Sequence, residues 1–476
     1  MSTPPRAVAL RACSGLVAAA LAAALAAALA APPGAAASAE RVTTRSWQTL
    51  SSSASPNFAQ AAVTRTFDGA QHVVWIVDNP DGTHNYEHTM ISPTGSQGAV
   101  SRILTTNWAQ LSTPVDLGVN ADGSLRLAFR GTIDGDTSNF FTYQGVYTAV
   151  SSDGGTSWAV PREVLVRAIG DGGVTLAHTP DGTPITGYGD TSGFHWGVGS
   201  VPEAAVPTAT LLEFTDHDAN AASLVASGGS VYVVYQTIRG AGIYARQVWP
   251  TLGAALKAPG EYTNPGQPMA VVDRPGVGPV AAYTIDAKVV LWDILANRIH
   301  RVRGMDGPNN VALATLPDGH LWLAAQGPIG YTPRVSRVSA RGWTIDRRPR
   351  LLDDMYSTFG LEVGSAGALR AELLLTGNDS GDPSRIHAMS ALAQLSVKAT
   401  PRRWRVERAQ TVVFKVTDVD GRVARVKVRA GGRRCTTNGT GRCTIRFPAQ
   451  SRPGRIDVKT TKRSYYPAKT KLTVRR

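Results

Sequence analysis

The sequence predicts an all-β chain in which a large β-propeller is followed by a small β-sandwich. Two observations carry this prediction. Short alternating strands recur at intervals of roughly 40–55 residues between about Val63 and Leu395, and this spacing is typical of propeller blades. After Leu395 the composition changes sharply, and apolar and basic side chains alternate between turns.

The repeated unit is a hairpin of two short apolar strands joined by a tight turn. In the clearest copy, Pro114–Val119 and Leu125–Arg130 flank an Asp-Gly step, a strong hairpin signal because glycine takes φ > 0 without strain. Seven hairpins favour seven blades, or six if the first copy closes another blade. An array of β-sandwiches is the alternative architecture. The other six expected hairpins are Ala62–Thr66 with His72–Asp78, Val174–Thr179 with Ile185–Asp190, Leu224–Ala226 with Val231–Gln236, Val271–Asp273 with Val280–Asp286, Val311–Leu316 with Leu321–Gln326, and Leu361–Val363 with Leu369–Asn378.

One turn carries a more specific motif. Residues 151–158 read Ser-Ser-Asp-Gly-Gly-Thr-Ser-Trp and follow the alternating strand Gly145–Val150. Asp153 can accept N–H groups of its own turn, Gly155 can take φ > 0, and Trp158 can bury its ring beneath a neighbouring hairpin. The segment resembles the Asp-box (BNR) repeat of sialidase-like β-propellers. The resemblance implies a structural turn on the face away from the active site, with Trp158 buried between blades.

Residues 1–39 are predicted to be a signal peptide. Arg6 and Arg11 precede the apolar run Leu16–Ala31, and Ala37-Ser38-Ala39 offers a small-residue cleavage site. An uncleaved membrane anchor is the alternative, but about 16 apolar residues are short for a span. We therefore expect a secreted or cell-wall-associated protein with no transmembrane anchor after cleavage.

The remaining chain divides into a propeller domain, 40–395, and a basic domain, 396–476. Cys435 and Cys443 bracket an Asn-Gly turn signal, and an even cysteine count in an exported chain predicts a disulfide across that hairpin. The tail resembles bacterial Ig-like or carboxypeptidase-regulatory-like modules. Its expected strands are Val412–Val416, Val423–Val428, Cys443–Phe447, Ile456–Lys459 and Leu472–Val474.

Charge separates the two domains. Residues 396–476 hold 23 Lys and Arg against 4 Asp and Glu, a net charge of about +19, whereas the whole chain carries +14. A polyanion such as wall teichoic acid, acidic polysaccharide or anionic lipid headgroups is the expected partner of this domain. A solvated basic surface is the alternative. Nucleic acid is not expected, because no aromatic stacking platform accompanies the charges.

The topology of a propeller places the loops between second and third strands on the same rim as the connections between blades. The second strands end in polar residues, and the adjoining loops add aromatic and imidazole groups. Aromatic faces beside carboxylates suit a sugar ring, while a strand end that simply meets water is the alternative explanation. No metal or cofactor is expected, because neither Asp216 with Asp218 nor His84 with His88 forms a complete ligand set. The expected rim residues are Asp78, Arg130, Asp190, Gln236, Asp286, Gln326 and Asn378, joined by His84, Tyr86, Trp108, His195 and Trp196.

These features favour a carbohydrate-binding or cell-surface-binding protein. A glycoside hydrolase that uses the carboxylates of Asp78, Asp190 and Asp286 is one alternative. A polysaccharide lyase, with His84, Tyr86 or His195 transferring the proton, is another. Sialidase activity is not expected. The resemblance implies three arginines around the substrate carboxylate. Only Arg130 stands at a rim position, with Arg239 and Arg334 as looser candidates, and no Arg-Ile-Pro motif occurs near the mature N-terminus.

Overall fold

The computed structural model describes residues 48–51, 61–132, 144–168, 173–199, 211–219, 221–237, 242–260, 269–286, 288–306, 310–326, 333–346, 350–351, 358–367, 369–377 and 385–476. All of them belong to one compact unit that begins at Thr43. Within these ranges the chain forms strands and turns and no helix, so none of the described segments is a helix that could cross a membrane. The predicted signal peptide, Arg239 and Asn378 lie outside the described residues.

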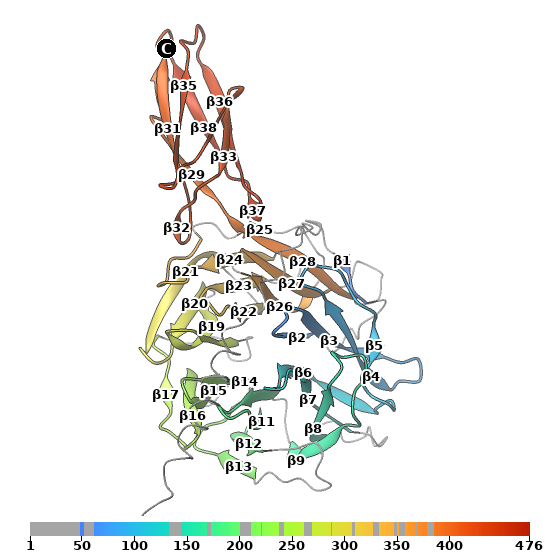
Figure 1. The fold of residues 1–476 in the computed structure, drawn as a ribbon. Coiled ribbons are helices and arrows are strands. Elements are labelled where there is room, and N and C mark those ends of the chain that lie inside the picture. The colour runs from blue at the N-terminus through green and yellow to red at the C-terminus, as the bar shows by residue number, and fades with distance from the viewer. Residues whose placement is uncertain are drawn as a thin grey trace, which may run out of the picture. The chain divides into compact units, whose positions relative to one another are not determined.

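Six four-stranded antiparallel sheets and a seventh sheet, whose main path also has four antiparallel strands, follow one another through the described residues up to Gln394 (Figure 1). In the first six, the four strands pair in chain order. These are β2 (Ala62–Arg65), β3 (Gln71–Asp78), β4 (His84–Ile91) and β5 (Ser101–Arg102); β6 (Gln110–Val119), β7 (Leu125–Thr132), β8 (Gln144–Ser151) and β9 (Arg162–Ala168); β10 (Val174–His178), β11 (Pro184–Gly189), β12 (Phe194–Val198) and β13 (Leu211–Phe214); β14 (Ala221–Ser227), β15 (Ser230–Thr237), β16 (Gly242–Trp249) and β17 (Leu256–Lys257); β18 (Ala270–Arg274), β19 (Gly278–Ile285), β20 (Lys288–Asp293) and β21 (Arg298–Asp306); and β22 (Asn310–Thr315), β23 (Leu321–Gln326), β24 (Arg334–Val338) and β25 (Arg350–Leu351).

The last sheet closes the series into a ring. It contains β26 (Thr358–Gly367), β27 (Arg370–Gly377) and β28 (Arg385–Gln394), and its fourth strand is β1 (Gln48–Thr49) from the start of the described chain. The first strand of each sheet contacts the first strand of the next, and β26 contacts β2. The architecture is therefore β-propeller-like, and each of the seven predicted hairpins is an antiparallel pair.

Apolar side chains fill the space between neighbouring sheets. One cluster joins Ile76 and Tyr86 of the first sheet to Leu127 and Phe129 of the second, and it also contains Trp158. Because each sheet packs on both faces, its inner strands are buried along nearly their whole length, as in β3 and β23. Trp158 is 8% exposed, so the prediction that it is buried between neighbouring sheets is confirmed.

Residues 396–476 form two further sheets whose inner faces share one apolar core (Figure 1). Alternate residues such as Phe414 and Leu472 point into this core, and the residues between them are exposed, as a two-sheet sandwich requires. One sheet has β31 paired with β29, β32 and β35, and the other has the order β30-β38-β36-β33-β34. The bounds are β29 (Ser396–Thr400), β30 (Arg403–Arg405), β31 (Gln410–Asp418), β32 (Gly421–Arg422), β33 (Lys427–Ala430), β34 (Arg433–Thr436), β35 (Arg442–Phe447), β36 (Gly454–Thr461) and β38 (Lys469–Arg475), while β37 (Tyr465–Tyr466) pairs with β28.

Two details of this tail differ from the sequence prediction. The strand expected from Val423 begins at Lys427 instead, after Arg425, whose φ of 58° lies in the left-handed region that strands avoid. The cysteines do not lie on the two strands of one hairpin. Cys435 lies on β34, which pairs with β33, and Cys443 lies on β35, which pairs with β31.

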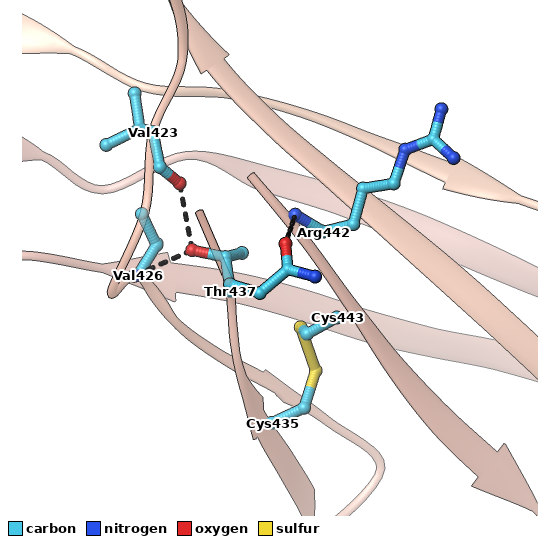
Figure 2. Close-up of a disulfide and its surroundings, with 7 residues drawn as sticks. Val423, Val426, Cys435, Thr437, Arg442 and Cys443 are labelled. Carbon is cyan, nitrogen blue, oxygen red and sulfur yellow. Dashed lines mark hydrogen bonds between the residues drawn. A yellow bond between two sulfur atoms is a disulfide. The ribbon is translucent and has the colours of Figure 1, made fainter. Parts of the chain in front are cut away.

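The disulfide therefore joins the two sheets of the sandwich (Figure 2). The Cα atoms of Cys435 and Cys443 are 5.9 Å apart. Beside the bond, Thr437 Oγ1 donates to the carbonyl of Val423 at 2.8 Å and accepts from the N–H of Val426 at 2.9 Å. These two hydrogen bonds hold Thr437, which lies between the two cysteines in sequence, against the Val423–Val426 segment that leads into β33.

Candidate functional site

The turn at Ser151–Trp158 is built by its own side chains. Asp153 accepts bonds from the N–H of Ser157 at 2.9 Å and from the hydroxyls of Ser157 and Ser151 at 2.6 and 2.8 Å. These bonds, those from Ser157 foremost, lower the pKa of Asp153 to about 2. Trp158 donates its indole N–H to the carbonyl of Gly155 at 3.2 Å. The polar groups of the turn thus serve its own geometry.

This turn packs against a pair of histidines from the first sheet. The rings of His72 and His88 stack with centroids 5.2 Å apart, and His72 Nδ1 lies 3.0 Å from His88 Nε2. His88 in turn meets the edge of Trp158, and Ser101 donates to the carbonyl of Gly155 at 2.8 Å. Burial, with the adjacent His72 ring, lowers the pKa of His88 to about 4. The pair is therefore neutral near pH 7 and acts as packing between the two sheets.

A second turn of this kind, at Ser339–Trp343, is organised by a different residue. No aspartate occupies its middle; instead the fully buried Arg274 of the preceding sheet donates to the carbonyls of Ser339 and Gly342 at 2.6 and 2.7 Å. The guanidinium also stacks over the ring of Trp343, 4.6 Å from its centroid. The first turn is therefore held by a carboxylate within the turn, and the second by a guanidinium from the neighbouring sheet.

On the rim opposite these turns, the three predicted aromatic ligand-binding residues are all buried. Tyr86 lies within β4 rather than in a loop and is 0% exposed. Trp108 is 2% exposed because its backbone pairs with His84, which folds the ring beneath Phe129 and Tyr147. Trp196 is also 2% exposed, within the cluster around Phe194. None of the three presents a ring face to solvent, and this burial contradicts their predicted role as sugar-stacking residues.

Three of the predicted polar rim residues are also enclosed. Gln236 and Gln326 are each 1% exposed and Arg130 is 7% exposed, because the strands that carry them remain inside the sheets at these positions. Arg130 lies close to Tyr86, whose pKa is raised well above its ordinary value by burial, an effect that the Arg130 charge opposes. These side chains belong to the interior of the ring sheets rather than to an open surface.

Asp190 and His195 come together at the end of the third sheet. Asp190 Oδ1 accepts from the N–H and hydroxyl of Ser192 at 2.7 and 2.6 Å and from the N–H of Gly193 at 3.0 Å. Burial favours a higher pKa for Asp190, but hydrogen bonds from His195 and Ser192 outweigh it, and the pKa is lowered. An ionised carboxylate committed to its own turn is a poor general acid, which argues against the catalytic role predicted for it.

His195 nevertheless has an unusual setting. Its Nε2 lies 3.4 Å from Asp190 Oδ1 and 3.1 Å from the Ser192 hydroxyl, while Nδ1 lies 3.1 Å from Glu213 Oε2. The ring stacks on Tyr188, with centroids 4.9 Å apart. An imidazole between two carboxylates is held in one orientation and can transfer a proton if a substrate reaches it.

Asp78 and His84, two of the predicted rim residues, form an accessible pair. His84 Nδ1 lies 2.7 Å from Asp78 Oδ1, and the carboxylate is exposed. Beside them, Arg102 donates to the side-chain oxygens of Asn79 at 3.1 Å and Asn107 at 3.4 Å. We call these five residues the rim cluster. Asn79 starts the β3–β4 turn and Asn107 lies in the connection to β6, so all five belong to the rim.

Sequence reasoning missed the centre of this cluster. Arg102 lies on a two-residue strand that no periodic pattern marks, and Asn79 and Asn107 are 28 residues apart in the chain. Sequence reasoning also missed a second ion pair, between the half-buried Arg246 and the exposed Asp216: Arg246 Nη1 lies 2.6 Å from Asp216 Oδ1, and the guanidinium stacks over Phe214. Asp286, the third predicted catalytic carboxylate, is exposed at a turn with φ of 49°.

Within the described part of the chain, no three His, Cys, Asp or Glu side chains form a group that could hold a metal ion.

Comparison with known proteins gives only distant likenesses. No protein-family model matches the sequence, and no curated protein sequence matches it. One similar structure is a protein of unknown function from Dyadobacter fermentans, with 13% identity, a TM-score of 0.43, and coverage of 73% of this chain and 99% of that one. Another is the NanB sialidase from Streptococcus pneumoniae, with 10% identity, a TM-score of 0.44, and coverage of 73% and 70%. A third is a PL25 ulvan lyase, with 12% identity, a TM-score of 0.36, and coverage of 62% and 79%.

Proposed function

We propose that this chain is an exported carbohydrate-binding protein. Residues 1–39 act as its signal peptide, residues 40–395 form a seven-bladed propeller that contacts a sugar through the rim, and residues 396–476 form an Ig-like module that attaches the protein to an anionic polymer. The Ser151–Trp158 turn then serves as an Asp-box that fastens two blades together. The location that follows is extracellular or associated with the cell wall.

The rim cluster is the observation that carries this proposal. Asp78, Asn79, His84, Arg102 and Asn107 place several donors and acceptors at one surface, and the cluster's own hydrogen bonds hold them in position. A sugar presents alternating hydroxyl donors and acceptors, and planar side chains with both functions match that pattern. A preorganised cluster also loses little side-chain entropy when it binds.

Sialidase activity does not fit this proposal. A sialidase must grip the carboxylate of its substrate with several accessible arginines, since charge-assisted bidentate contacts give that recognition its strength. Arg130 is buried, and Arg334 donates to the carbonyl of Gly304 at 2.7 Å. A rim whose exposed groups include Asp78 and Asp286 suits a neutral sugar better than an anionic one.

A second candidate function is a glycoside hydrolase or polysaccharide lyase centred on His195. His195 is 7% exposed, like Arg130, but it lies against the exposed side chain of Glu213, and its position between Asp190 and Glu213 supports a role in proton transfer. Tyr86 does not support the lyase alternative, because full burial and a raised pKa remove it from substrate and from deprotonation near neutral pH.

The experiment is a glycan array probed with the purified full-length mature protein, followed by a reducing-sugar assay on each ligand found. We expect binding to neutral glycans without product release. Arg102→Ala should weaken that binding by at least on the order of tenfold, because it removes a charge-assisted hydrogen bond to the sugar worth about 1.5–3 kcal/mol. Arg162→Ala is the matched control, since Arg162 is also exposed on an outermost strand but lies at the end that faces the Ser151–Trp158 turn.

Two results would contradict the proposal. If Arg102→Ala and Arg162→Ala bind equally well, the rim cluster is not the site. If product forms and its formation disappears in His195→Asn, the second candidate is the correct one.

A further inference from the structure

The outer face of the five-stranded tail sheet carries a straight row of four positive charges. Lys459 pairs in register with Lys469 on one side and with Arg429 on the other, and Arg429 pairs with Arg434. The row therefore crosses β38, β36, β33 and β34 without a break. Neighbouring strands lie about 4.8 Å apart, so four strands span roughly 14 Å. We call these four residues the cationic row.

Nothing in the described structure neutralises this row. All four side chains are exposed, and no carboxylate among the described residues lies within ion-pair distance of any of them. Like charges placed directly opposite each other destabilise a sheet. The row thus lowers the stability of the fold, and an anionic ligand bound along it would reduce the repulsion between its charges.

A groove of about 820 Å³ lies beside the row. It is lined by Arg429, Arg434 and Lys459 of the row, by Arg433 at the β33–β34 turn, and by the carboxylate of Asp457. Cations supply contacts for anionic groups, and the single carboxylate supplies an acceptor for hydroxyl donors. A ligand that satisfies both carries acids and hydroxyls on one chain, which is the chemistry of an acidic sugar.

The opposite sheet provides an internal comparison. Lys398, Lys415 and Arg442 also pair in register there. The cavity beside Lys398 and Lys415 is also lined by Lys469 of the row and by the carboxylates of Asp346 and Asp418. Its two acids offset two of its three positive charges, whereas the groove next to Arg429 holds four cationic side chains and one carboxylate, so that groove is the more favourable anion site.

Other polyanions fit this face less well. Every aromatic side chain of the tail, namely Trp404, Phe414, Phe447, Tyr465 and Tyr466, is buried and cannot stack on nucleic-acid bases. No large apolar side chain is exposed among residues 396–476, all of which are described, so the face offers no group that would insert into a lipid surface.

We propose that the cationic row and its groove bind a linear acidic polysaccharide, with the sugar carboxylates or sulfates along the row and a sugar hydroxyl at Asp457. This inference specifies the polyanion of the proposed function and rests on it. The two can fail separately, because the glycan experiment concerns the rim and neutral sugars, whereas this one concerns the tail sheet and acidic polymers.

The test measures binding of the full-length mature protein to polygalacturonate, with dextran as the neutral probe. A row variant, Arg429→Gln with Arg434→Gln and Lys459→Gln, is compared with a control variant, Arg405→Gln with Arg455→Gln and Arg475→Gln. Both lose three exposed charges from the same five-stranded sheet. Each cation near an anionic surface contributes about fivefold in affinity, so the row variant should bind roughly a hundredfold more weakly. The control variant should bind less than about tenfold more weakly than the native protein.

A second variant tests the hydroxyl contact. Asp457→Asn removes a negative charge, and simple electrostatics then predicts tighter binding to every polyanion. The proposal instead expects weaker binding to polygalacturonate and tighter binding to inorganic polyphosphate, which carries no hydroxyl groups along its chain.

Three outcomes would overturn the inference. Equal losses in the row and control variants would mean that only the total charge matters. Tighter binding of Asp457→Asn to both polymers would remove the sugar contact. Stronger binding of the native protein to duplex DNA or to phosphatidylglycerol vesicles than to polygalacturonate would identify a different partner. A melting temperature at or above that of the native protein verifies that each variant folds, and relief of the like-charge repulsion should raise it in the row variant.

Discussion

The imidazole of His88 occupies the space that a side chain at Gly155 would need. A Cβ atom built on Gly155 would stand 2.0 Å from the imidazole Cε1 of His88, and Gly155 has a φ of +89°. The glycine of the Ser151–Trp158 turn is therefore required twice, once by its own backbone and once by a histidine of the neighbouring sheet. A turn within the second sheet is thus fitted to the surface of the first.

We expect Gly155→Ala to destabilise the protein by about 2–5 kcal/mol. Left-handed backbone costs an L-residue about 1–2 kcal/mol, and overpacking adds about 1–3 kcal/mol. Gly154→Ala is the control, because Gly154 also has positive φ but nothing within 4 Å of its added Cβ, so its cost should stay near about 1–2 kcal/mol. Urea unfolding measures both, and equal losses would show that His88 does not press on the turn.

The buried histidine pair should make stability depend on pH. Burial lowers the pKa of both rings, that of His88 to about 4. Between that value and the unfolded pKa of about 6.5 the unfolded chain binds more protons, so stability rises with pH through this window and is lost as the pH falls through it. His88→Gln should flatten the dependence of the unfolding midpoint on pH between 4 and 6.5. A slope unchanged in this variant would assign the effect to other groups.

Arg274 should be essential to the Ser339–Trp343 turn. Arg274→Lys keeps the charge, but its single nitrogen cannot replace both Nε, which donates to the carbonyl of Gly319, and Nη2, which donates to those of Ser339 and Gly342. Each buried carbonyl left without a donor costs about 1–3 kcal/mol. We expect a loss of about 2–4 kcal/mol in the free energy of unfolding. Arg341→Lys, at an exposed position in the same turn, should change it by less than about 0.5 kcal/mol. Similar effects from both substitutions would contradict the role assigned to Arg274.

Purified protein should release no sialic acid from fluorogenic or natural sialosides. Arg130 is enclosed by the ring sheets, and substrate carboxylates need accessible arginines. Measurable turnover that disappears in Arg130→Ala would mean that this side chain becomes accessible and that the excluded activity is real.

Removing the disulfide should loosen the tail sandwich. Cys435 and Cys443 are separated by 8 positions, and closing so short a loop contributes about 2–3 kcal/mol in the chain-entropy account. The Cys435→Ala and Cys443→Ala double variant should unfold at lower denaturant concentration, and a reductant should shift the native protein equally. A native protein insensitive to reductant would show that the bond contributes nothing to stability.

The ring sheets could be predicted from sequence because their signals are local. Each Asp-Gly turn holds its geometry with its own side chain: Asp122 accepts from the N–H of Ser124 at 2.9 Å, and Gly123 has a φ of +87°. Apolar runs on either side of such a turn then have few alternatives to pairing with each other.

The predicted site was less accurate because exposure depends on distant partners. Tyr86 looked like a loop residue beside His84, but pairing with β3 extends the strand to His84 and buries Tyr86 against Phe129. The cationic row is a second feature that could not be predicted from sequence alone. The sequence showed the total charge of the tail, whereas the alignment of Lys459 with Arg429 and Lys469 depends on strand register.

Among the described residues, the last ring sheet is completed by two that precede the first sheet in sequence. Gln48 and Thr49 pair with Ala388 and His387, and the Thr49 hydroxyl lies 3.3 Å from His387 Nδ1, across 338 positions of sequence. This strand pairing cannot form until nearly the whole ring has been synthesised. Until it forms, β28 presents a free strand edge that the same short segment of another molecule could fill, which is the geometry of domain swapping. A small segment at the edge of the fold thereby governs whether the ring closes on itself or on a neighbour.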